Sequence, residues 1–400
     1  MKLHIAATLL LLIATVTTIS AETYAPTRDT LELSERQEKS LHRQQRRDSI
    51  RANKKVWTSI LGGPSYTPEA SAGVAGAVLI SFKTNEKDTI SQRSFFPMGV
   101  NFSINGTLVV AGAGTLFFNE NRFRIYSTYN FRNEPANFYG VGMSEIESNY
   151  RSDTTTLYQK QCVNLYNRFV WNVRDNIFVG PLMDINYSKS TDMNEVMLAN
   201  SYIQSYRTTY TNIGIGGVVQ YDSRDNIATP TNGMLLSAIA RIYGRYLGGT
   251  YNYEILDLEY RQFKPLFKRA TLAWTARTQL SYGDVPFTEL PSFGSPSDLR
   301  GFYIGEYRDR SMGYGIVEYR QMFGTVEDLR RGRFLAKLGY VVWAGTGTIG
   351  ATPADWSEWK YNYGVGLRIQ LQPGKNFRLD IGKGQGESDM MVYFNMTEAF

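Results

Sequence analysis

The residues that most often carry out catalysis are nearly missing from this chain of 400 residues. Its only histidines are His4 and His42. General acid–base and nucleophilic catalysis usually depend on a positioned histidine, and neither a cluster of metal ligands nor a glycine-rich phosphate loop stands out. Hydrolysis by carboxylates alone is the remaining enzymatic alternative. We therefore expect a protein that is not an enzyme and that has no cofactor or metal.

Charged residues occur instead in three motifs. The first is Tyr221-Asp222-Ser223-Arg224-Asp225-Asn226, followed by Pro230 and Gly233. The second is Leu299-Arg300-Gly301-Phe302, and the third runs from Tyr361 to Arg368 and continues through Pro373-Gly374 to Phe377-Arg378-Leu379-Asp380. For Asp222, Arg224 and Asp225 we favour a solvated, hydrogen-bonded turn. Direct contact with a substrate is the alternative.

Elsewhere, between residues 63 and 400, apolar and polar residues alternate with a period of two. Tyr363, Val365 and Leu367 share one face of a strand, and Arg368 lies on the other; residues 123–132, 163–174 and 256–261 repeat the pattern. The runs approach the 9–11 residues that cross a bilayer as a tilted strand. Charged residues in mid-strand suit a wet interior and not lipid, which disfavours the alternative of a soluble sandwich. We predict an all-β fold, a transmembrane antiparallel β-barrel of about sixteen strands.

The two ends of the sequence carry signals for export. Residues 1–21 have a polar start at Lys2, an apolar stretch from Ile5 to Thr18 and a small-residue cleavage site at Ser20-Ala21. The stretch is too short for a transmembrane helix and is typical of a signal peptide. Phe400 follows an alternating strand and resembles the C-terminal sorting signal of outer-membrane barrels. We expect the cell outer membrane as the location and its lipid as a partner.

Residues 22–62 form a basic tail that we expect to be helical and periplasmic. From Ser34 to Lys55 there are eight basic and three acidic residues, a balance of 8 − 3 = +5. Glu, Gln, Lys and Arg favour a helix, and Gly62-Gly63-Pro64 could stop it. The tail could plug the barrel against wall acids such as Asp257 and Glu259, dock on an acidic partner or headgroups, or be a solvated linker.

Cysteine content and net charge exclude two further classes. Cys162 is the only cysteine, so an intramolecular disulfide is impossible. The net charge of +6 is spread along the chain apart from the tail. For an exported protein it gives no case for nucleic acid as a partner.

Taken together, the three motifs resemble the barrel of the BamA/TamA superfamily, the bacterial surface-antigen family that inserts or translocates proteins at outer membranes. The first motif is similar to the family's strand-turn-strand signature, the second to its VRGF/Y loop and the third to its closing hairpin. Each motif alone is weak, but their order and spacing, with Phe400 at the end, are specific. The resemblance covers roughly residues 68–400.

The resemblance implies a role for Arg300. In this family the loop arginine folds back into the barrel interior and pairs with acids of the inner wall, as a guanidinium in a narrow lumen must. Glu318 stands where the family often has one such acid. The second would fall near Trp343, where this sequence has no acid, and Asp380 is a possible substitute. The alternative is that Arg300 caps a surface turn.

The resemblance also implies a function. The family usually carries POTRA domains before the barrel, and residues 22–62 are too few for one, so we expect a barrel-only member. Its role would be insertion or translocation of proteins at the outer membrane, or that of an accessory subunit, with nascent outer-membrane proteins or other periplasmic and outer-membrane subunits as partners. A seam between the first and last strands would template incoming strands; we place the first strand at Glu69–Phe82, which is rich in small residues. The alternative is a passive porin-like channel or structural barrel.

Overall fold

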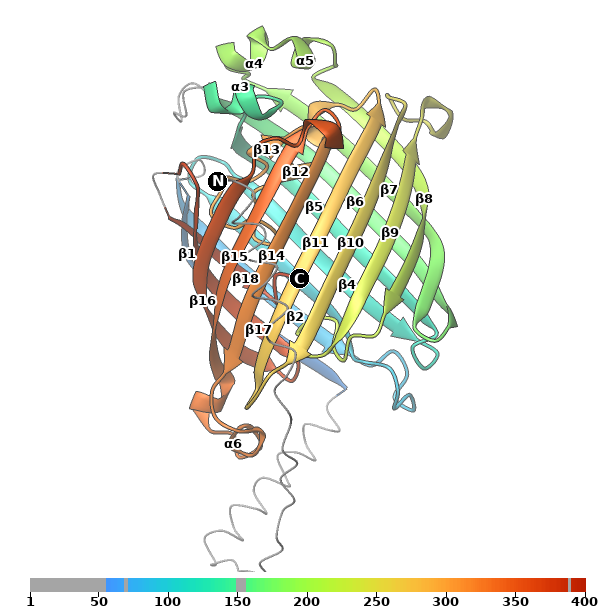
Figure 1. The fold of residues 1–400 in the computed structure, drawn as a ribbon, viewed down its shortest axis with the longest axis vertical. Coiled ribbons are helices and arrows are strands. Elements are labelled where there is room, and N and C mark those ends of the chain that lie inside the picture. Colours follow the sequence, from blue (N-terminus) through green and yellow to red (C-terminus); the bar gives the residue numbers. More distant parts are fainter. Residues whose placement is uncertain (1–54, 68–70, 149–155, 388–389) are drawn as a thin grey trace, which may run out of the picture. The chain divides into compact units, whose positions relative to one another are not determined.

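One antiparallel sheet of 16 strands makes up most of the chain (Figure 1). The computed structural model describes residues 55–67, 71–148, 156–387 and 390–400; the expected signal peptide and most of the expected tail lie outside them. Within this sheet each strand pairs with the next of the sixteen in chain order, and antiparallel neighbours need no crossover connection. The strands are β1 (Val56–Thr67), β2 (Ser71–Phe82), β3 (Ser94–Ser103), β4 (Leu108–Phe118), β5 (Phe123–Asn137), β6 (Leu157–Arg174), β7 (Ile177–Thr191), β8 (Thr209–Asp222), β9 (Gly233–Tyr243), β10 (Tyr253–Pro265), β11 (Ala270–Gly283), β14 (Ser311–Met322), β15 (Leu338–Gly350), β16 (Lys360–Gln372), β17 (Lys375–Gly384) and β18 (Met391–Met396).

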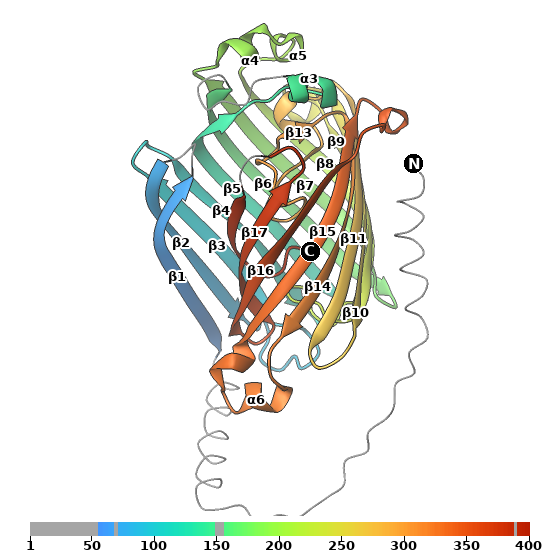
Figure 2. The same cartoon turned by 60° about the vertical axis from the view of Figure 1, so that its left-hand side comes forward.

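The connections at the two ends of the sheet differ in length. At one end, called here the α4 end, the links include α3 (Met143–Ser148), α4 (Glu195–Ala199), α5 (Ser201–Gln204), η1 (Arg245–Leu247), η2 (Phe287–Glu289), η4 (Pro353–Asp355) and the two-residue strands β12 (Ser292–Phe293) and β13 (Tyr307–Arg308). The other end, called the α6 end, carries short turns, the links 83–93 and 223–232, and a longer link with α6 (Val326–Arg330) and η3 (Phe334–Lys337) (Figures 1 and 2). No helix in the described ranges is long and apolar enough to cross a membrane, which bears on helices alone and not on a β-barrel.

The polarity of the sheet is inverted relative to a water-soluble protein. Apolar side chains on its outer face are exposed, among them Trp171, Leu258 and Val365. The inner face buries charged side chains such as Asp257, Arg368 and Asp380. The alternation predicted from the sequence and the strand number of about sixteen are therefore confirmed, and this distribution is the one expected of a barrel with a polar interior and an apolar surround.

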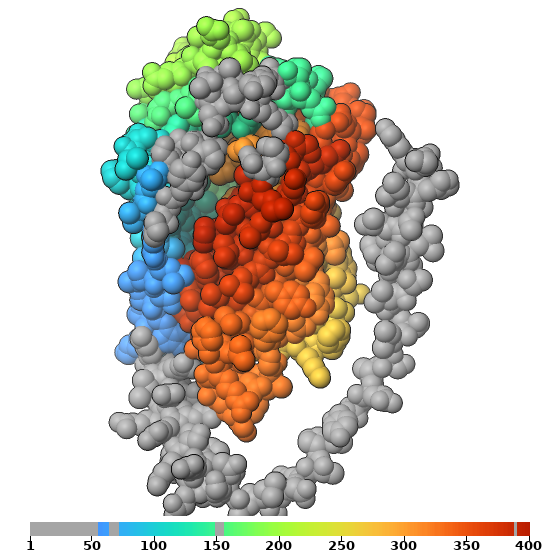
Figure 3. All heavy atoms as spheres, turned by 90° about the vertical axis from the view of Figure 1, so that its left-hand side faces the viewer, coloured from blue at the N-terminus to red at the C-terminus, as the bar shows by residue number. Residues whose placement is uncertain are grey.

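The sheet curls so that its first and last strands approach one another, yet among the described residues β1 and β18 are not paired with each other. Figure 3 shows blue N-terminal residues of the sheet beside its red C-terminal residues, with teal residues visible farther back between them. β1 has 12 residues and β18 has 6, so even full pairing would leave part of β1 without a partner. We call this boundary the seam.

The expected boundary between tail and barrel at residue 62 is wrong. The sheet already begins at Val56, and Gly62-Gly63-Pro64 lies inside β1 and stops no helix. Residues 57–61 continue the period of two, with Ile60 73% exposed on the outer face. Pro64 is tolerated because β1 is an edge strand and one of its sides needs no hydrogen-bond donors. The expected first strand at Glu69–Phe82 is therefore the second one, β2.

Candidate functional site: the interior loop and its anchor

The loop between β11 and β14, residues 284–310, folds into the barrel interior. Within it, β12 pairs with β13 through Ser292 and Arg308. The Asp298 carboxylate accepts hydrogen bonds from the Gly294 amide at 3.0 Å and from the Ser295 hydroxyl at 2.7 Å. These local bonds turn the chain sharply just before Leu299. The motif Leu299-Arg300-Gly301-Phe302 is thereby presented to the inner wall.

The Arg300 side chain has no exposed surface, and its partners come from three strands. Its guanidinium pairs with the Glu318 carboxylate on β14 and, at 2.6 Å, with the Asp380 carboxylate on β17. The ring of Trp343, on β15, lies 3.7 Å from the guanidinium carbon. A delocalised, planar cation is suited to two carboxylates and an aromatic face at once.

This arrangement explains the departure of the sequence from the family pattern. Trp343 occupies the place where a second acid was expected, and it contributes its ring face to Arg300. Asp380 supplies the second carboxylate, and it also accepts hydrogen bonds from Arg368 at 2.6 Å and Arg378 at 2.9 Å. The alternative of a surface turn at Arg300 is wrong, because the side chain is fully buried.

The backbone of the motif is held as firmly as its side chains. The Gly301 amide donates to the Tyr393 hydroxyl at 2.8 Å, and the Asn362 side-chain amide donates to the Arg300 carbonyl at 2.6 Å. Gly301 has a φ of +113°, and a Cβ added there would come within 2.5 Å of the Lys383 backbone. Only glycine allows this approach without displacing β17.

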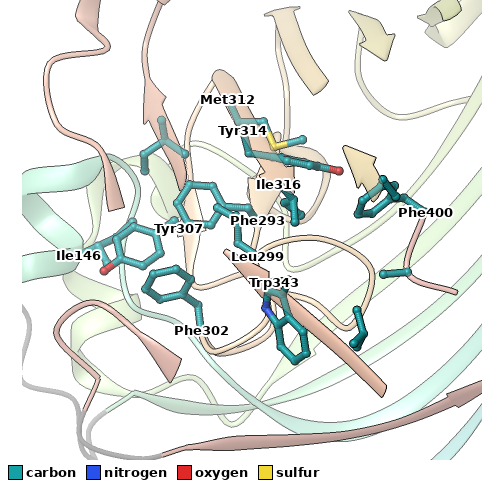
Figure 4. Close-up of a cluster of buried hydrophobic side chains, with 14 of the residues drawn as sticks. Ile146, Phe293, Leu299, Phe302, Tyr307, Met312, Tyr314, Ile316, Trp343 and Phe400 are labelled. Carbon is teal, nitrogen blue, oxygen red and sulfur yellow. The ribbon is translucent and has the colours of Figure 1, made fainter. Parts of the chain in front are cut away.

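The two apolar residues of the motif complete the attachment. Leu299 and Phe302 are fully buried. The Phe302 ring lies 5.8 Å from that of Phe293 and 5.2 Å from that of Tyr307, an edge-to-face geometry that aromatic rings prefer. Figure 4 shows these rings together with Leu299 and Trp343. All four residues of the predicted loop motif thus contact the wall or the loop itself.

The strand-turn motif after β8 differs in part from our expectation. The Asp222 and Arg224 side chains are buried and not solvated: the Arg224 Nε lies 2.8 Å from the Asp222 carboxylate. The same carboxylate accepts a hydrogen bond from Arg124, on β5, at 2.6 Å. An interior charge needs a counter-charge once water is excluded, so Asp222 ties β8 to β5 rather than facing solvent.

The rest of that motif forms the turn that we expected. The exposed Asp225 carboxylate accepts hydrogen bonds from the amides of Asn226, Thr231 and Asn232. The Asn226 side chain accepts from the two amides that follow Ile227. Pro230 lies within the turn, and Gly233, with a φ of +96°, begins β9. These residues shape the connection and reach no part of the interior loop in the described contacts.

Several residues of the anchor were missed in the sequence. Asn362, which lies inside the third motif, and Tyr393, which lies outside all three, hold the loop backbone, and neither was identified as a partner of the loop. Arg320 contacts Glu318 at 2.7 Å and donates to the Phe400 carbonyl at 3.2 Å. The one available signal was alternation, which places Arg320 on the same inner face as Glu318. Phe400, expected as a sorting signal, lies buried in the interior.

The side chains around Arg300 are arranged to hold the interior loop in place. In the described parts of the chain no group of three or more His, Cys, Asp or Glu side chains could hold a metal. The carboxylates of Glu318 and Asp380 are both paired with arginines. The arrangement fixes a loop inside the barrel through charge.

We predict that the anchor behaves as one unit. Replacing Arg300 by Ala or Glu318 by Gln leaves a buried partner charge uncompensated, which costs about 3–5 kcal/mol, less where water enters. Each variant should make the loop 284–310 more sensitive to protease in the folded barrel, and the double variant should be no worse than the worse single one. Arg310→Ala, which removes a half-buried arginine of the same loop whose guanidinium donates to the Gly283 carbonyl at 3.1 Å, is the control. Wild-type protease resistance in both single variants would show that the pairing does not hold the loop.

A second prediction separates Asp222 from its neighbour in the same turn. Asp222→Asn removes the charge shared by Arg124 and Arg224, and we expect a loss of about 3 kcal/mol in the free energy of unfolding. Asp225→Asn affects an exposed turn and should cost about 1 kcal/mol. Urea unfolding in detergent micelles, followed by tryptophan fluorescence, measures both. Equal midpoints for the two variants would mean that the buried pair contributes no more than the turn.

Comparison with known proteins agrees with this geometry. Residues 93–400 match the Omp85 superfamily domain. Among solved structures, BamA from Haemophilus ducreyi lacking POTRA domains 1–3 matches with a TM-score of 0.53 and 13% identity, over 85% of this chain and 69% of that one. CdiB from Acinetobacter baumannii matches with a TM-score of 0.51 and 14% identity, over 86% of this chain and 60% of that one. No protein in the curated collection matches the sequence.

The two structural matches establish a shared fold, and this chain spans less than two thirds of the CdiB structure. The match to the domain covers more than half of the sequence and includes all three motifs recognised above. In residues 55–400, with the gaps stated, the structure shows the one curled sheet, its connections and the residues after β18, and no separate domain. The protein belongs to the Omp85 superfamily.

Proposed function

We propose that this protein inserts or translocates other proteins at the bacterial outer membrane, or serves as an accessory subunit of a machine that does so. The observation that carries the proposal is the seam. β1 presents an edge of backbone N–H and C=O groups that β18 does not pair. Such an edge can accept an incoming strand by the same hydrogen bonds that hold a sheet together.

The contacts across the seam are few and lie at the α6 end. The Gln372 side chain, at the end of β16, donates to the Ser59 hydroxyl of β1 at 2.9 Å and accepts from the Ser81 hydroxyl of β2 at 2.5 Å. A small apolar cluster joins Leu79, on β2, to Met396, on β18. Side-chain contacts of this kind can break without disrupting a strand ladder, because no backbone pairing depends on them.

The two sides of the seam are held unequally. β17 and β18 are fixed to the interior loop by Asp380 and Tyr393. On the other side, the inner face of β2 carries the small residues Gly73, Ala75 and Ala77, and Ala77 lies opposite Leu61 of β1. Small side chains make fewer dispersion contacts. Opening would therefore move β1 and β2 rather than the anchored strands.

A passive channel is the competing function. The interior is filled by side chains toward the α4 end, where Tyr210, Tyr243 and Tyr253 form one buried cluster with Phe287 and Leu290. The interior loop forms a second cluster beside it. An open pore needs a continuous water path, and these clusters favour the insertion or translocation role.

Locking the seam tests this role. In a Cys162→Ser background, cysteines replace Ser59 and Gln372, whose side chains are hydrogen-bonded across the seam, and a thiol assay measures how much disulfide forms under oxidising conditions. We expect the locked protein to fail in cells depleted of the wild type, with a fall in other outer-membrane barrels by proteomics, and to recover on reduction.

The matched control places cysteines at Asn186 and Asn212, neighbouring positions on the paired strands β7 and β8, and should retain function when oxidised. Normal barrel levels with the seam locked would refute a function that needs the seam to open. A rise in ion conductance of the unlocked protein alone would point to the channel instead.

The proposed location makes its own prediction about the outer face. Leu258 points outward from β10, and Gln279, opposite Asp257 on β11, points inward. In lipid, Leu258→Lys should lower the free energy of unfolding by about 2–4 kcal/mol near the bilayer midplane. Gln279→Lys should cost much less, because its ammonium enters a polar interior. Folding titrations in phospholipid vesicles measure both; equal costs would contradict a lipid-facing outer surface.

A further inference from the structure

Residues 397–400 leave the sheet after β18 and turn into the interior. Thr397 has a φ of +72°, which ends the strand. Its amide donates to the Asn376 carbonyl at 2.7 Å, and the Glu398 amide donates to the Ala228 carbonyl at 3.1 Å. Ala399 and Phe400 are buried as a result. We call these four residues the inner segment.

The inner segment is held by side chains from four different strands. The Glu398 carboxylate accepts hydrogen bonds from Arg368 of β16 at 2.8 Å and from the Asn376 side chain of β17 at 2.9 Å. Arg320 of β14 donates to the Phe400 carbonyl at 3.2 Å, and its guanidinium lies 4.9 Å from the Phe400 ring. That ring lies 6.2 Å from the ring of Phe263, on β10. The wall thus forms a site for one carboxylate and one aromatic ring.

This site is continuous with the anchor of the interior loop. The charged groups alternate in sign and close on themselves, with the Arg320–Glu398 distance of 4.0 Å as the longest step. The order of the circuit is Arg300, Glu318, Arg320, Glu398, Arg368, Asp380 and back to Arg300. Glu398 is the only member of this circuit that belongs to neither the wall nor the loop.

The side chains around the inner segment carry an excess of positive charge. Four guanidinium groups gather here, those of Arg300, Arg320, Arg368 and Arg378, against two carboxylates other than that of Glu398, those of Glu318 and Asp380, which leaves 4 − 2 = +2. Among side chains, Glu398 reduces the excess to +1, and the main-chain oxygen of Phe400 accepts a further hydrogen bond from Arg320. Although burial alone would raise it, the pKa of the Glu398 carboxyl is held below its ordinary value by Arg368 and then Arg320. An unbalanced group of buried cations favours an anionic occupant.

Two further observations point to a ligand site. Arg320 Nη1 and Arg368 Nη2 are buried and have no hydrogen-bond partner in the described part of the chain, so each can still donate to an acceptor. A cavity of about 50 Å³ also adjoins the inner segment. It is lined by Arg320, Arg368, Asn376 and Glu398 and by residues 229–231 of the turn at the α6 end. The cavity therefore lies between that turn and the carboxylate half of the inner segment.

We propose that Arg320, Arg368, Asn376 and Phe263 form a binding site for a short peptide segment with a carboxylate two residues before an aromatic ring, and that the protein's own residues 397–400 occupy it as a displaceable internal ligand. The carboxylate meets the excess positive charge. The ring fills the space between Phe263 and the Arg320 guanidinium. The inference concerns this interior site and holds independently of the seam.

Peptide binding to the emptied site tests the proposal. Glu398→Gln combined with Phe400→Ala keeps the full chain but removes both recognition groups of the inner segment. A fluorescein-labelled, C-terminally amidated peptide of sequence Asn-Met-Thr-Glu-Ala-Phe is titrated against the purified barrel in micelles, with fluorescence anisotropy as the readout. We expect binding to the double variant at least tenfold tighter than to the wild type, whose site is filled. Adding Arg320→Ala should abolish this gain.

A control peptide and a check of the fold make the result decisive. The peptide with Gln for Glu and Ala for Phe should not bind either protein. Heat-modifiable migration on gels confirms that the double variant is folded, and a milder variant, Glu398→Gln alone, is used if it is not. Failure of the peptide to bind a folded variant, or binding that Arg320→Ala does not reduce, overturns the proposal.

Discussion

A guanidinium group with no exposed surface must be neutralised where it lies, and this requirement at Arg300 organises the C-terminal half of the barrel. Its carboxylates come from β14 and β17 and its aromatic face from β15. The loop can occupy the interior only when these strands are in register, because each contact depends on a side chain at one position of the wall. The charge thus couples the placement of the loop to the correct assembly of three strands.

The same coupling makes the barrel unequal around its circumference. From β14 to β18 the inner wall is joined by ion pairs and by the loop, whereas β1 joins the rest through β2 and a few side chains at the α6 end. Rigid and movable regions are therefore next to each other at the seam. A protein that must stay folded while one edge accepts a strand needs this division, since opening then costs few interactions.

Parts of this organisation could be predicted from the sequence and parts could not. Alternation identified the strands because residues such as Leu258 and Arg368 obey a strict period of two. The motif around Arg300 predicted the interior loop. Its pairing with Asp380 could only be suggested, because that pairing depends on which strands are neighbours. β1 was hidden because a basic run and Gly62-Gly63-Pro64 imitate the end of a helix. The role of Glu398 was missed because Thr397 breaks the alternation that would have placed it.

The order of Arg300 and its partners along the chain has a consequence for the time course of folding. Glu318, Asn362 and Asp380 all follow Arg300, the last by 80 residues. Contacts of such long sequence separation form late, because the loop-closure entropy must be overcome first. The interior is therefore sealed only after the final hairpin has formed, and the docking of the loop marks the completion of the barrel.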